Sequence, residues 1–118
     1  MTYRVRLSNR RRSETIDVLH EGIRFRVSVG FDVDGQPKEV FVVGDRQGSM
    51  VDAILDDAAI LVSRHLQTGG TAAELRTSMS RFGGSLGAAT APASPIGCVV
   101  DLVAAIEAEA GQQLTETT

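Results

Sequence analysis

The chain has 118 residues, a formal net charge of −3 and 42% hydrophobic residues. This length predicts a single domain, and the lone cysteine, Cys98, excludes an internal disulfide framework and fits a reducing cytosol. No apolar run approaches the roughly 20 residues of a membrane-spanning helix, and the N-terminus lacks the apolar segment of a signal peptide. We therefore expect a soluble, cytoplasmic protein without membrane contact.

Residues 1–13 form a basic N-terminal arm that includes Arg10, Arg11 and Arg12. Mutual repulsion of the three arginines favours an extended, solvated arm. One interpretation is a phosphate or nucleic-acid contact through these three residues, because the planar guanidinium suits phosphate oxygens. The other is a solvated arm that pairs with the acidic remainder of its own domain or of a partner subunit.

Alternation of apolar and polar residues predicts three antiparallel strands over about 14–19, 23–31 and 38–43. Gly22 marks the first turn and Asp34-Gly35 the second, since glycine accepts a positive φ. Pro37 precedes the third strand, where its missing N–H does least damage. The continuous apolar run Val40 to Val43 predicts a strand that is covered on both faces or lies at the centre of the sheet.

Three helices follow the strands. Ser49 and Asp52 have capping-box spacing and predict a helix over about 50–67, and Thr71 and Glu74 predict a second over about 72–82. The two would form a helical hairpin. One apolar stripe is predicted for the first helix, made of Met50, Ile54, Leu55, Ala58, Leu61, Val62 and Leu66.

A connector rich in small residues spans 83–93, and Ser94-Pro95 then begins a C-terminal helix over about 95–109. Gly111 is expected to end it, which leaves a disordered tail over 111–118. The predicted architecture is therefore α+β, with a three-stranded antiparallel sheet, a helical hairpin and a C-terminal helix in one domain over 14–110.

No nucleophile–base pair or metal cluster can be read from the spacing of residues. Asp56 and Asp57 are adjacent in a predicted helix, so their side chains diverge. Cys98 is interpreted as a small core or boundary residue, and one thiolate with only His20 and His65 makes a zinc site doubtful. We therefore assign no catalytic and no metal-binding residue from the sequence. A stand-alone enzyme stays open as a third alternative, in which residues distant in sequence converge in the fold.

Several short motifs in the middle of the chain resemble those of a known family. They are Asp34-Gly35-x-Pro37-x-Glu39-Val40-Phe41, Gly48-Ser49, Ala58 through Ser63, and Leu66-Gln67-Thr68-Gly69, with Asp101 in place near the end. This pattern is similar to the TSCPD domain, found at the C-terminus of vitamin B12-dependent (class II) ribonucleotide reductases and in small standalone proteins. The ends resemble a short standalone subgroup from alphaproteobacteria and their phages. The family's Thr-Ser-Cys-Pro-Asp segment corresponds here to residues 97–101, with Cys98 one position early.

The resemblance implies a non-catalytic accessory or binding module linked to ribonucleoside-diphosphate reduction and hence to synthesis of deoxyribonucleotides. Expected partners are the large subunit of a ribonucleotide reductase, or a nucleotide or nucleic acid. Separately, a domain this small buries only a modest fraction of its surface, which favours a homodimer. Cobalamin would enter only through a partner reductase, and we expect no cofactor bound by this chain. The alternative is a phosphate- or nucleic-acid-binding module that uses the arginine arm.

Overall fold

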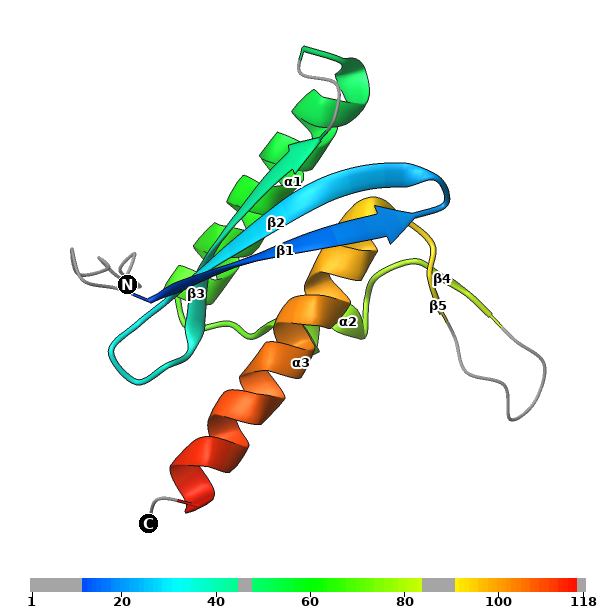
Figure 1. The fold of residues 1–118 in the computed structure, drawn as a ribbon. Helices are drawn as coiled ribbons and strands as arrows, with labels where there is room; N and C mark the ends of the chain where they lie inside the picture. Colours follow the sequence, from blue (N-terminus) through cyan, green and yellow to red (C-terminus); the bar gives the residue numbers. More distant parts are fainter. Residues whose placement is uncertain (1–11, 45–47, 84–90, 117–118) are drawn as a thin grey trace.

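The structure is a computed structural model that describes residues 12–44, 48–83 and 91–116, with side chains described as far as Gly111. The elements in chain order are β1 (Ser13–His20), β2 (Ile23–Phe31), β3 (Pro37–Gly44), α1 (Met50–Gln67), α2 (Ala72–Arg76), β4 (Arg81–Phe82), β5 (Ala91–Pro92) and α3 (Pro95–Glu116). Figure 1 shows β1, β2 and β3 together, β4 and β5 apart from them, and α3 extending away from the three-stranded sheet. The predicted α+β architecture is confirmed.

The first three strands form an antiparallel sheet in the order β1-β2-β3, as predicted. Glu21 and Gly22 connect β1 to β2 with φ angles of 50° and 78°, and two positive φ values in a two-residue loop match the right-handed twist of a hairpin. Gly35 has φ +83° in the next turn. These turns fix the register, so that Val27 faces Ile16 on one side and Val42 on the other.

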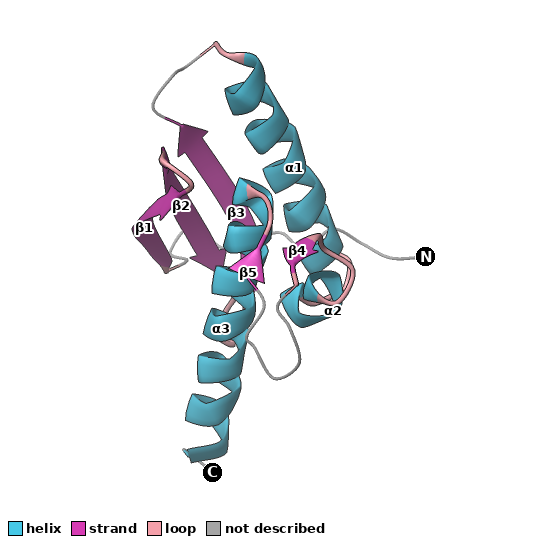
Figure 2. Cartoon of the chain, turned by 90° about the vertical axis from the view of Figure 1, so that its right-hand side faces the viewer, coloured by secondary structure: helices cyan, strands magenta, loops and turns pink. Residues whose placement is uncertain are grey.

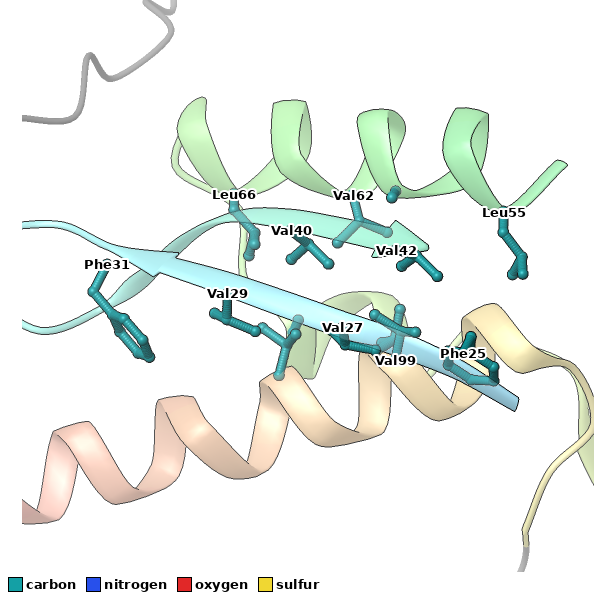
Figure 3. Close-up of a cluster of buried hydrophobic side chains, with 14 residues drawn as sticks. Phe25, Val27, Val29, Phe31, Val40, Val42, Leu55, Val62, Leu66 and Val99 are labelled. Carbon is teal, nitrogen blue, oxygen red and sulfur yellow. The ribbon is translucent and has the colours of Figure 1, made fainter. Parts of the chain in front are cut away.

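The core lies on one face of this sheet. Its strand residues include Phe25, Val27, Val29 and Val40, all at most 3% exposed. Figure 2 shows α3 crossing this face and α1 lying beside β3, at the end of the sheet opposite β1. Figure 3 shows side chains from α1 and from Val99 of α3 meeting the strands. The opposite face carries the alternate residues of each strand and is called the open face below.

The strand β3 lies at the edge of the sheet, and its Phe41 and Val43 are 54% and 50% exposed. The expectation of a central strand, or of one covered on both faces, was therefore wrong. The physical reason is that α1 occupies the place of a fourth strand. Ser63 Oγ accepts from the Val40 N–H at 2.8 Å and donates to the Val40 carbonyl at 3.1 Å, and Asp52 Oδ1 accepts from the Gly44 N–H at 3.2 Å. A helix that satisfies these edge groups lets β3 be apolar without a neighbouring strand.

The helix α1 has the predicted bounds, and Ser49 caps it by accepting from the Asp52 N–H at 3.1 Å. The single predicted stripe was wrong in part. Leu55, Val62 and Leu66 point toward the sheet and are buried (Figure 3). Three residues of the same predicted stripe, Met50, Ile54 and Leu61, are 80%, 59% and 69% exposed. The helix therefore presents a second apolar face to the outside.

The second half of the chain departs from prediction at two helix ends. The helix predicted over 72–82 is only α2, Ala72–Arg76, and Arg81–Phe82 instead form β4, which pairs with β5. Glu107 of α3 accepts from the backbone N–H groups of Ala72 and Ala73 at 2.7 and 3.1 Å, which fixes α2 against α3. The helix α3 passes through Gly111 to Glu116, so residues 111–116 do not begin a disordered tail. One glycine costs a helix only about 1 kcal/mol relative to alanine.

Candidate functional site

Polar side chains from several elements gather near the beginning of α3. Cys98 and Asp101 lie one helical turn apart on α3, His20 ends β1, Arg81 begins β4 and Arg76 ends α2. The cluster contains the segment that corresponds to Thr-Ser-Cys-Pro-Asp. Among the described residues, we take this cluster as the candidate site.

Asp101 binds two arginines. Arg81 donates from both terminal nitrogens, at 3.0 Å to Oδ1 and 2.9 Å to Oδ2, and Arg76 Nε donates to Oδ1 at 3.0 Å. The hydrogen bond from Arg81 lowers the pKa of Asp101, with further lowering by Arg76, while partial burial opposes this. Bidentate pairing of this kind fixes geometry as well as charge. The cluster therefore joins α2, β4 and α3.

The thiol of Cys98 lies 3.0 Å from Nδ1 of His20, 78 positions away in sequence. Burial raises the pKa of Cys98 and Asp101 raises it further, with Arg81 acting in the opposite direction. A raised pKa keeps the thiol protonated at neutral pH, whereas a nucleophilic cysteine needs the thiolate. Nε2 of His20 is buried without a hydrogen-bond partner in the described part of the chain. The pair therefore connects the β1–β2 hairpin to α3 and places a thiol within hydrogen-bond distance of an imidazole nitrogen.

Sequence reasoning missed this contact. The strand predicted over about 14–19 ends one residue before His20, whereas β1 includes it. The available signal was that His20 has the same parity as Ile16 and Val18, so that continuing the strand by one residue points its side chain toward the core face. Cys98 stands just before the buried Val99 and Val100. The alternation along a strand shows on which face of the sheet a side chain lies, but it does not show which other segment of the chain covers that face. Within residues 12–44, 48–83 and 91–111, no group of three or more His, Cys, Asp or Glu is placed to hold a metal ion.

The pairing of Asp101 predicts a dependence of stability on acid. The pKa of Asp101 in the folded state lies below its ordinary value, so the folded state binds fewer protons than the unfolded state in the acid range where aspartate titrates. The stability that Asp101 contributes is thus present above its unfolded pKa and is lost as pH falls through its folded pKa. We expect Asp101→Asn to flatten the acid limb of a plot of unfolding free energy against pH between about 5 and 2.

Urea unfolding at several pH values would measure this effect. Asp17→Asn is the control, because Asp17 pairs with Arg26 at 3.0 Å but its side chain is 79% exposed. An acid limb that is equally steep in Asp101→Asn and the wild type would contradict the assignment.

Of the predicted phosphate-binding residues, Arg10 and Arg11 lie outside the described residues. The guanidinium of Arg12 lies over the ring of Phe31 at 4.2 Å and its Nη2 is 3.6 Å from Glu14. The Arg12 carbonyl also accepts from the Phe31 N–H at 3.0 Å. Arg12 is therefore tied to the sheet, while the phosphate-binding role stays a prediction.

The predicted motif residues occupy different structural positions. Gly35 and Gly48 have φ +83° in turns, Ser49 caps α1, and Pro37 is buried at the beginning of β3. Glu39 is half-buried and faces Gly30. Phe41 differs from these residues because its ring is largely exposed on the open face of the sheet.

The open face combines apolar and charged side chains in cross-strand rows. One row is Asp17, Arg26 and Val43, a second is Leu19 and Arg24, and a third is Thr15, Ser28 and Phe41. A hollow of about 500 Å³ lies over the first two rows. Leu19 is 64% exposed, similar to Phe41 and Val43, and exposed apolar groups with polar neighbours are typical of interaction surfaces.

No helix in the described part of the chain is both long enough and apolar enough to cross a membrane. A comparison with curated proteins and one with solved structures each gave no match. A comparison with protein-family models matched the TSCPD domain over residues 1–109. This match includes the three-stranded sheet, α1, α2, the part of α3 up to residue 109, and the segment containing Cys98 and Asp101. The chain belongs to the TSCPD domain family.

Proposed function

We propose that this protein is a non-catalytic module that binds the large subunit of a ribonucleotide reductase and thereby serves deoxyribonucleotide synthesis. The observation that carries the proposal is the family match over residues 1–109, because this family is associated with ribonucleotide reductase. In this proposal the radical chemistry and its cobalamin belong to the reductase. The present chain contributes a binding surface.

The chemistry of the cluster supports binding over catalysis. The thiol of Cys98 is held protonated by burial and by Asp101, and Asp101 is occupied by two arginines. Asp101 therefore joins elements of the fold and is not a free carboxylate that could act as base, and the raised pKa of Cys98 favours the thiol over the thiolate beside His20.

The open face is the surface we assign to the partner. Exposed aromatic residues commonly supply a large part of the binding energy at protein interfaces, and Phe41 is the one aromatic residue on this face in the described strands. Arg24 is exposed beside Leu19, where it can meet an acidic group of the partner. The proposal therefore predicts contact through Phe41, Val43, Leu19 and Arg24.

Binding to the purified large subunit from the same organism tests the proposal, with the present chain labelled and titrated. We expect Phe41→Ser to weaken binding about tenfold or more, as for loss of an interface anchor. Its effect on stability should be small because the ring is 54% exposed. Val33→Ser is the control, since Val33 is 89% exposed in the β2–β3 turn, away from the open face.

No binding by the wild type at 100 μM (about −5.5 kcal/mol), or equal binding by wild type and Phe41→Ser, would contradict the proposal. The same titration with a short DNA strand tests the alternative function of the arginine arm. Affinity for DNA that falls steeply with salt, without binding to the reductase, would favour that alternative.

A further inference from the structure

The helix α1 carries an apolar stripe that faces away from the core. We call Met50, Ile54 and Leu61 the outer stripe; they are 80%, 59% and 69% exposed. At about 100° per residue, these three side chains lie within an arc of about 40°. The buried residues Leu55, Val62 and Leu66 lie about 100–140° around the same 18-residue helix from the centre of the stripe. A helix with an apolar face beyond the one that packs on its own core is typical of one that is covered there as well.

Two opposite charges lie on one flank of the outer stripe. Asp57 and Arg64 both fall within about 60° of its centre and on the same side. They are seven positions apart, or about 10 Å along the helix, which is too far for an ion pair within one helix. Both are exposed, and neither forms an ion pair with another described residue.

This pattern is complementary to itself under a two-fold axis. When two copies of a helix pack antiparallel, side chains on the same flank face each other, and every contact occurs twice. An axis near residue 59 places Asp57 of each copy within about 5 Å, along the helices, of Arg64 of the other copy. The same register interleaves Ile54 and Leu61 of one copy with those of the second.

We propose that the outer stripe of α1 is the interface of a homodimer, in which two α1 helices pack antiparallel and Asp57 pairs with Arg64 of the other copy. A second copy is the occupant that the charge pattern selects, because the residues that pair are supplied by the same helix. The contact is small compared with the roughly 800 Å² per partner of a standard interface. We therefore expect a dimer with a dissociation constant in the micromolar range.

Sedimentation velocity of the purified chain tests the proposal. The concentration is varied from about 5 to about 500 μM, a range chosen to include a dissociation constant in the micromolar range. We expect the wild type to shift from monomer to dimer over this range, and Leu61→Glu to remain monomeric. Asp57→Arg alone should weaken dimerisation several-fold by placing like charges opposite each other. The double variant Asp57→Arg/Arg64→Asp should restore it, because the pair is re-formed with its signs exchanged.

Asp56→Arg is the matched control, since Asp56 lines a hollow beside β3 with Ile60 and is turned away from the outer stripe. It should dimerise as the wild type does. A wild type that stays monomeric at 500 μM (about −4.5 kcal/mol), a Leu61→Glu variant that still dimerises, or a double variant no better than Asp57→Arg would overturn the proposal. The assay contains no reductase, so its outcome is independent of the function proposed above.

Discussion

Replacement of Leu66 by alanine should lower the free energy of unfolding by about 2–5 kcal/mol, whereas Leu61→Ala should change it by less than about 0.5 kcal/mol. Leu66 is 1% exposed and points from α1 into the core (Figure 3). Leu61 is 69% exposed on the outer stripe. Truncation of a buried leucine loses its transfer free energy and leaves a cavity. Truncation of an exposed one loses little burial.

Urea unfolding of both variants measures this difference. The protein concentration is about 1 μM, which is chosen to lie below the dissociation constant expected for the dimer. At that concentration dimerisation does not add to the stability of the wild type. The two substitutions remove the same atoms from the same helix, so helix propensity cancels between them. Similar losses for Leu61→Ala and Leu66→Ala would show that the outer stripe is covered within one chain.

Replacement of Ser63 by alanine should destabilise the protein by about 1–3 kcal/mol, the cost of leaving a buried backbone group unsatisfied. The Ser63 hydroxyl accepts from the Val40 N–H at 2.8 Å and donates to the Val40 carbonyl at 3.1 Å. Ser63 is 5% exposed and Val40 is 2% exposed. Without the hydroxyl, the N–H and the carbonyl of Val40 both lose their hydrogen-bond partner from α1.

The control is Ser28→Ala on the open face, where Ser28 Oγ lies 3.3 Å from Thr15 Oγ at an exposed position. We expect it to change the unfolding free energy by less than about 0.5 kcal/mol. Hydrogen exchange at Val40 gives a second readout, because its amide should exchange faster in Ser63→Ala. Unchanged stability together with unchanged exchange would show that water or another group replaces the hydroxyl.

Because α1 satisfies the edge of β3, that edge does not need another strand as partner. The surfaces left for partners are then the open face with Phe41 and the outer stripe of α1. We propose the first for the reductase and the second for another copy of the chain.

The sequence by itself determined the three strands, their hairpin order and the bounds of α1. These features depend on local chemistry, namely alternation along each strand, positive φ at Gly22 and Gly35, and the Ser49 cap. Local motifs also led to the TSCPD family, which the family match confirmed. Local signals failed where a distant group fixed the backbone. Arg81 is held by Asp101 of α3, and this region forms β4 rather than the end of a helix.

Only the tertiary structure decided which apolar residues of α1 are buried and which polar residues meet. In sequence Leu61 and Leu66 are equivalent members of one stripe, and only the position of β3 separates them. The Cys98–His20 contact and the pairing of Ser63 with Val40 join segments that are far apart in the chain. Periodicity gives the direction of a side chain along its own element but carries no information about which element will cover it. The choice among alternative packings is made by burial of the whole core, and the candidate surfaces are what that choice leaves exposed.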